Sequence, residues 1–142
     1  MKKIINVLLL VPLLAFAGLD IPKVNSALSS IKLSKIPSTT LKFYNNNKSL
    51  DLKEKLQFTS QNSADIVLFP KRKKVNKVSV VDSYKALKKD KNSIGAIYVK
   101  KGRTQIVFVK ERLKKNGFDI LKISEKYLIP ECQLQSICLL TK

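Results

Sequence analysis

Apolar residues recur at helical spacing near the start of the chain, within residues 18–38. This spacing predicts a short amphipathic helix, followed by a linker that contains Pro37. The apolar positions of the helix are Ile21, Val24, Leu28 and Ile31.

A strand and a second helix are predicted next. Residues 39–44 have the composition of a strand, and the three asparagines at 45–47 predict a turn after it. Asp51 and Glu54 have the spacing of a capping pair, which predicts a short helix from there to about Phe58. The apolar side of this helix would consist of Leu52, Leu56 and Phe58.

Two continuous apolar runs follow, at residues 65–69 and 78–81. Strands without polar alternation are typical of a sheet that is covered on both faces, so these runs predict a sheet flanked by helices. Directly after the second run, Asp82 or Ser83 is placed to cap a short helix over residues 84–89.

The clearest local pattern is a β-hairpin. Residues 94–99 and 104–109 are apolar on both faces, which places the hairpin centrally in the sheet. The four-residue loop between them contains Gly102, which is free to adopt a positive φ. A basic helix is predicted over residues 110–116, with Gly117 as its stop signal.

A last short helix is predicted from Ser124, ahead of a C-terminal tail at residues 131–142. The order of elements predicts an α/β fold with a single domain at residues 39–130. Its mixed sheet would have about five strands flanked by helices, with a central C-terminal β-hairpin. A chain of 142 residues buries enough apolar surface to form a stable core without a cofactor.

Residues 1–17 have the three parts of a secretory signal peptide. Two lysines precede an apolar stretch, and Ala15 and Ala17 form an A-x-A cleavage site ahead of Gly18. A membrane anchor is the alternative, but a spanning helix needs about 20 apolar residues and Asp20 interrupts the run early. Cleavage would remove 17 of the 142 residues and two lysines, which lowers the formal charge from +18 to +16. We therefore expect an exported protein, located in the periplasm of a Gram-negative cell.

Export bears on the two cysteines, Cys132 and Cys138, which are separated by five residues. In an oxidising compartment, cysteines this close most often form a disulfide. The ring-closure model assigns such a bond roughly 2 to 2.5 kcal/mol, and it would staple the C-terminal tail. The alternatives are a redox-active pair or two free thiols, although the spacing differs from the C-x-x-C motif of redox enzymes.

Composition narrows the function classes. The chain has 28 Lys and Arg, 10 Asp and Glu and no His, while 44% of its residues are hydrophobic. This apolar fraction indicates a globular core rather than a disordered basic tail. Without His there is no Ser-His or Cys-His catalytic pair and no His-bound metal, and ten scattered acids do not suggest a carboxylate metal cage. We therefore expect a binding protein without enzymatic activity, cofactor or metal.

Residues 71–77 hold five positive charges and no acid. This first basic cluster suits an anionic partner such as a phospholipid, lipopolysaccharide, an anionic glycan or an acidic protein face. The alternative is a solvated loop in a lysine-rich protein. Nucleic acid is not expected, because the chain has only three arginines and no aromatic residue lies among the charges. The candidate binding residues of the cluster are Lys71, Arg72, Lys73 and Lys74.

A second basic cluster covers the hairpin turn and the helix after it, residues 100–115. If the turn and the start of the helix share an edge, they form a positive rim for an anion. Arg103 is the first candidate, because its planar guanidinium suits a carboxylate or a phosphate. The neighbouring candidates are Lys100 and Lys101.

Ser83 and Tyr84 are further candidates, because hydroxyl groups at a strand-to-helix junction can hold a small ligand. The alternative is that Ser83 only caps the helix. No nucleophile in the sequence has a visible base, and no glycine-rich phosphate loop follows a strand. These absences also favour binding over catalysis.

A series of short motifs runs through residues 64–128. It consists of the apolar strand Ile66 to Phe69, Val-x-Asp-Ser at 80–83, Gly95 with Ile97, Gly102 with Arg103, Ile106 with Phe108, Gly117 with Phe118, and Ile123 and Ser124 before Leu128. In this order the motifs resemble the YfiR-like family of small periplasmic proteins. The resemblance implies a regulator that binds the sensor region of an inner-membrane diguanylate cyclase and releases it under envelope or redox stress. The same segment also resembles one lobe of a periplasmic solute-binding protein.

Two functions follow as expectations. The first is a YfiR-like periplasmic regulator whose partner is a membrane signalling protein. The alternative is a small solute-binding or envelope-associated protein that holds an anionic ligand, lipid or glycan on its basic rim. Neither involves catalysis, and they differ in whether a protein or a small anion occupies the basic residues.

Overall fold

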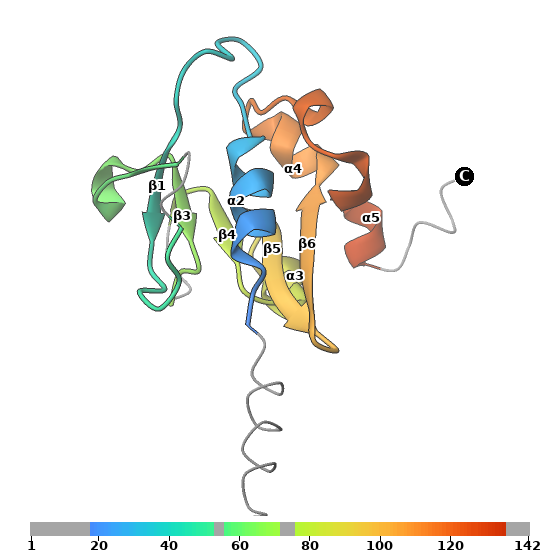
Figure 1. Cartoon of the computed structure of the whole chain (residues 1–142). Helices are drawn as coiled ribbons and strands as arrows, with labels where there is room; N and C mark the ends of the chain where they lie inside the picture. Colours follow the sequence, from blue (N-terminus) through green and yellow to red (C-terminus); the bar gives the residue numbers. More distant parts are fainter. Residues whose placement is uncertain (1–17, 53–55, 72–75, 136–142) are drawn as a thin grey trace, which may run out of the picture.

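The computed structural model of the chain describes residues 18–52, 56–71 and 76–135. Within these ranges the strands form one sheet flanked by helices, which confirms the predicted α/β class (Figure 1). The sheet has seven strands rather than about five, because very short strands at both edges join it. They are β1 (Lys42–Asn45), β2 (Gln57–Phe58), β3 (Ile66–Leu68), β4 (Ser79–Val81), β5 (Ser93–Lys100), β6 (Arg103–Val109) and β7 (Leu128–Ile129).

The strands lie in the order β2-β1-β3-β4-β5-β6-β7. Neighbours from β2 to β5 pair in parallel, β6 runs antiparallel to β5, and β7 is parallel to β6. The sheet is therefore mixed, as predicted. The parallel strands β1, β3, β4 and β5 all end at one edge of the sheet, which we call the carboxyl edge.

Helices cover both faces of the sheet. On one face, α2 (Ile21–Ser29) and α4 (Lys110–Lys115) contribute Leu28 and Leu113 to a core that contains Phe43 and Phe108. On the other face, α3 (Tyr84–Lys89) and α5 (Glu131–Leu134) contribute Leu87 and Leu134 to a second core around Ala96. Burial on both faces explains why Ile66, Val67 and Leu68 of β3 are all nearly inaccessible to water.

Local signals set the ends of the helices. Asp20 caps α2 by accepting a hydrogen bond from the Lys23 amide at 3.2 Å. At the end of α4, Gly117 adopts a φ of 83°. The Phe118 amide then donates to the Leu113 carbonyl at 2.9 Å, which is the Schellman arrangement. The predicted stop of this helix is therefore confirmed, one residue earlier than the predicted limit at 116.

The hairpin is present, but its turn is tighter than predicted. Lys100 pairs with Arg103, so the turn consists of only Lys101 and Gly102. Both have positive φ, 52° and 75°, which matches the twist of a two-residue hairpin. Of the two hairpin strands, β5 lies inside the sheet, between β4 and β6. On its other side, β6 pairs with β7 only through its last two residues.

At two predicted helices, the structure shows a short strand in the last part of the range. Gln57 and Phe58 form β2 instead of ending a helix, and the Phe58 ring lies 6.3 Å from the ring of Phe43. Glu54, half of the predicted capping pair, lies outside the described residues. Further on, the helix predicted from Ser124 is a single 3-10 turn, and Leu128 pairs with β6 in β7. In both places pairing at a sheet edge prevails over a weak local helix signal.

Candidate functional site

The carboxyl edge brings together predicted binding residues that are distant in sequence. Lys71 follows β3, Ser83 and Tyr84 follow β4, and Lys100 ends β5. The last residue of β4, Val81, pairs with Ala96, so β5 continues four residues beyond its neighbour. The hairpin therefore projects past the rest of the sheet (Figure 1).

The tip of this hairpin carries unpaired positive charge. Lys100, Lys101 and Arg103 are all exposed. Among the residues that the structure describes, the single ion pair is between Arg112 and Glu131, so none of the three tip cations has an acidic partner there. Val99 beside them is 41% exposed, which adds an apolar contact point to the tip.

The predicted positive rim is not formed. The hairpin turn precedes β6 and the start of α4 follows it, so they lie at opposite ends of a seven-residue strand. At about 3.4 Å per residue the separation is roughly 20 Å. Lys110 and the rest of α4 therefore belong to the opposite edge of the molecule, and an anion at Arg103 would not reach them.

Arg112 was predicted as part of that rim and is instead buried. Its guanidinium donates to the carbonyls of Leu87, Asp90 and Ser93 at 2.8, 3.1 and 3.0 Å. Its remaining donors, Nε and Nη2, bind the two carboxylate oxygens of Glu131, both at 2.8 Å. Arg112 thus joins α3, β5 and α5, and its charge is not available to a ligand.

The first basic cluster is only partly described. Lys71 is exposed at the carboxyl edge, whereas Arg72, Lys73 and Lys74 lie outside the described residues. Lys77 has a structural role, because its ammonium donates to the carbonyls of Asn62 and Ala64 at 2.6 and 2.8 Å.

Ser83 caps α3, as one of the two interpretations predicted. Its hydroxyl accepts a hydrogen bond from the Ala86 amide at 3.0 Å. Tyr84 is half-buried against the second core, together with Tyr98 of β5. Burial, with a smaller contribution from the charge of Tyr84, raises the pKa of the Tyr98 hydroxyl.

Cys132 lies in α5 and is disulfide-bonded. Cys138, its predicted partner, lies outside the described residues. The carboxylate of Glu131, the residue before Cys132, accepts hydrogen bonds from the Arg112 guanidinium. The Glu131 backbone amide donates to the Glu111 carboxylate at 2.7 Å. The beginning of the C-terminal tail is therefore held on the domain by side-chain contacts beside the disulfide.

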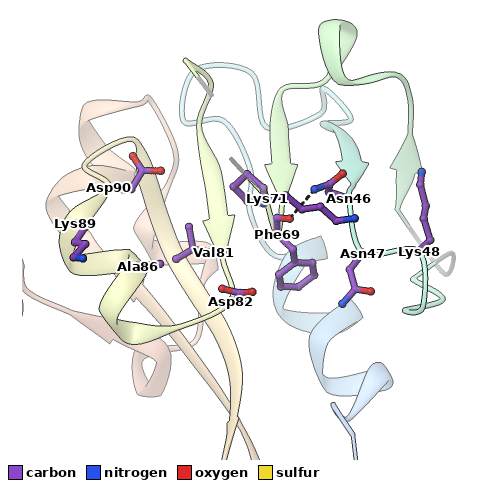
Figure 2. Close-up of a pocket in the computed structure, with 11 residues that line it drawn as sticks. Asn46, Asn47, Lys48, Phe69, Lys71, Val81, Asp82, Ala86, Lys89 and Asp90 are labelled. Carbon is purple, nitrogen blue, oxygen red and sulfur yellow. Dashed lines mark hydrogen bonds between the residues drawn. The ribbon is translucent and has the colours of Figure 1, made fainter. Parts of the chain in front are cut away.

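A pocket of about 950 Å³ opens at the carboxyl edge, where the sequence predicted no cavity. Asn46 and Asn47 follow β1, Lys71 follows β3, and Asp82 follows β4 (Figure 2). Phe69 lies between them, with a φ of 55°. The available signal was the polar residues that follow three predicted strands within a few positions, but its meaning depends on which strands are neighbours.

The described residues contain no helix with the length and apolar character to cross a membrane. In the same ranges, no three His, Cys, Asp or Glu side chains are grouped so as to hold a metal ion. Comparisons of the chain with protein-family models, with curated proteins and with solved structures find no match. The resemblance to the YfiR-like family therefore stays a prediction from the order of motifs.

Proposed function

We propose that this protein is exported and acts without catalysis, as a regulator that docks on an acidic face of a membrane signalling protein. The observation that carries the proposal is the hairpin tip formed by Val99, Lys100, Lys101 and Arg103. Its cations are exposed and have no acidic partner among the described residues. A carboxylate-rich partner would supply the missing counter-charge.

The extensive pairing of the two hairpin strands supports the same role. Six residue pairs join β5 and β6, from Gly95 with Phe108 to Lys100 with Arg103. A tip constrained by this pairing and by a two-residue turn would lose less conformational entropy on binding than a free loop. Arg103 adds a planar donor that binds a carboxylate through two hydrogen bonds.

The experiment is site-specific cross-linking from the tip in intact cells. A photoreactive amino acid replaces Val99, and the cross-linked product is recovered from the solubilised envelope and sequenced. We expect the cross-linked product to contain a membrane protein with an acidic exported region. Arg103→Glu should lower the yield by about tenfold or more, since it turns an attractive contact into a repulsive one.

A matched control is Lys122→Glu, which makes the same charge change at an exposed position away from the hairpin. It should leave the yield unchanged. Equal yields from Arg103→Glu and the parent, or recovery of lipid and glycan only, would contradict docking through the tip. Export is checked on the same cells, because cleavage after Ala17 gives a product that begins at Gly18.

A further inference from the structure

The pocket at the carboxyl edge occupies a distinctive place in the sheet. After β1 the chain adds β2 on one side, and it then returns to place β3 on the other side of β1. The direction of winding therefore reverses between β1 and β3. Parallel α/β sheets bind ligands at the carboxyl ends of their strands beside such a reversal, and a volume of about 950 Å³ is in the range of small-molecule sites.

The floor of the pocket is a strained residue. Phe69 is buried and has a φ of 55°, a conformation that bulky side chains rarely adopt. Hydrogen bonds hold it there, from the Phe69 amide to the Val80 carbonyl at 2.8 Å and from the Asn46 side chain to the Phe69 carbonyl at 3.2 Å. Strain of this kind recurs where a backbone is shaped for a ligand.

The walls carry three lysines, Lys48, Lys71 and Lys89, and two aspartates, Asp82 and Asp90, and none of them forms an ion pair with another described residue. Lys71 and Asp82 follow neighbouring strands, yet they form no ion pair with each other or with any other described residue. Figure 2 shows the Lys71 ammonium on the side of Asn46 and Asn47, with the Asp82 carboxylate across the Phe69 ring. A doubly charged anion would be attracted by Lys71 and repelled by Asp82.

We propose that this pocket binds a small zwitterion, of the class of free amino acids. Its carboxylate would contact Lys71 and the Asn47 amide, and its ammonium group would contact Asp82. One ligand then supplies a counter-charge to each of these two side chains. The site is separate from the hairpin tip, so it does not depend on the docking function proposed above.

The test is calorimetric titration of the full mature protein with each of the common free amino acids. For every amino acid that binds, its N-acetyl and its amide derivative are titrated as well. We expect binding of at least one free amino acid, with both derivatives weaker by about tenfold or more, because each lacks one charge-assisted hydrogen bond. Absence of binding by the whole set would overturn the proposal.

Two substitutions test which pocket side chain contacts each charged group of the ligand. Asp82→Asn should remove the preference for the free amino acid over its N-acetyl form, and Lys71→Met should remove the preference over its amide form. Lys122→Met is the control for loss of a positive charge elsewhere. Both pocket side chains are exposed, so an unchanged urea midpoint separates lost binding from lost folding. Inorganic phosphate that binds more tightly than any amino acid, and more tightly still to Asp82→Asn, would identify an anion site instead.

Discussion

At the scale of single residues, the Arg112 guanidinium joins parts of the chain that are distant in sequence. It donates to backbone carbonyls at the end of α3 and the start of β5, and it makes a two-point ion pair with Glu131 in α5. The side chain is 6% exposed, so water does not replace these bonds when they are lost. Arg112 is therefore a structural residue despite its place in a run of surface cations.

Replacing Arg112 by Ala should lower the free energy of unfolding by about 3 kcal/mol or more, because it leaves buried acceptors without a donor. Arg112→Lys should recover only part of this, since an ammonium group cannot form the two-point contact with Glu131. Urea denaturation of the parent and the two variants measures both effects. Arg103→Ala is the control, and its stability should stay within about 0.5 kcal/mol of the parent. An Arg112→Ala protein as stable as that control would show that the contacts of Arg112 do not contribute to the free energy of unfolding.

Tyr98 makes the free energy of unfolding depend on pH in the alkaline range. Its pKa is raised in the folded protein by burial and, to a smaller extent, by Tyr84. The folded state therefore holds this proton more tightly than the unfolded state, whose tyrosines titrate near pH 10. The stabilising effect is complete below that pH and is lost as the pH rises through the higher folded-state value.

Tyr98→Phe removes this proton from both states. We expect the urea midpoint of the variant to fall less than that of the parent between about pH 9 and about pH 11. The lysines titrate in both proteins and cancel in the comparison. Parallel pH profiles for the two proteins would mean that Tyr98 is solvated like a free tyrosine.

Single residues also show where sequence patterns are ambiguous. Ser83 and Gly117 were found from sequence because caps and stops depend on residues a few positions away. The structural roles of Arg112 and Lys77 were not predicted, because the sequence does not show whether the charge of an arginine or lysine faces water or backbone carbonyls. Their partners are between 13 and 25 positions away, and only the folded chain brings them within reach.

At the scale of elements, length decides what the sequence predicts. β5 and β6 are eight and seven residues long and are joined by a Gly-containing turn, so their pattern is clear without a structure. β2 and β7 have two residues each, which is too short for any periodicity. They are strands because β1 and β6 offer unpaired backbone groups at the edges of the sheet, and tertiary pairing overrides weak local preference.

For the candidate site as well, the parts made of consecutive residues were predictable from the sequence and the parts assembled by strand order were not. The hairpin tip was predicted because its residues are consecutive in sequence. The pocket was not, because Asn46, Lys71 and Asp82 become neighbours only when β1, β3 and β4 are placed side by side. The expected rim failed for a related reason, since β6 separates the turn from the helix that the sequence places close to it.

At the scale of the whole molecule, the dominant feature is uncompensated positive charge. The chain has a formal charge of +18, and its described residues form one ion pair, which is largely buried. The remaining cations therefore repel one another across the surface. Such repulsion destabilises a compact state more than an expanded one, and salt weakens it because the Debye length falls to about 10 Å at 0.1 M.

We therefore expect the urea midpoint at neutral pH to rise as NaCl is increased from about 0.02 M to about 0.3 M, a range in which screening dominates. The paired variant Lys35→Gln with Lys122→Gln removes two exposed charges without touching either core. It should be more stable than the parent in low salt and should gain less from added salt. Parent and variant that respond equally to NaCl would show that the salt acts on something other than charge repulsion, and the surplus lysines would then have no influence on folding.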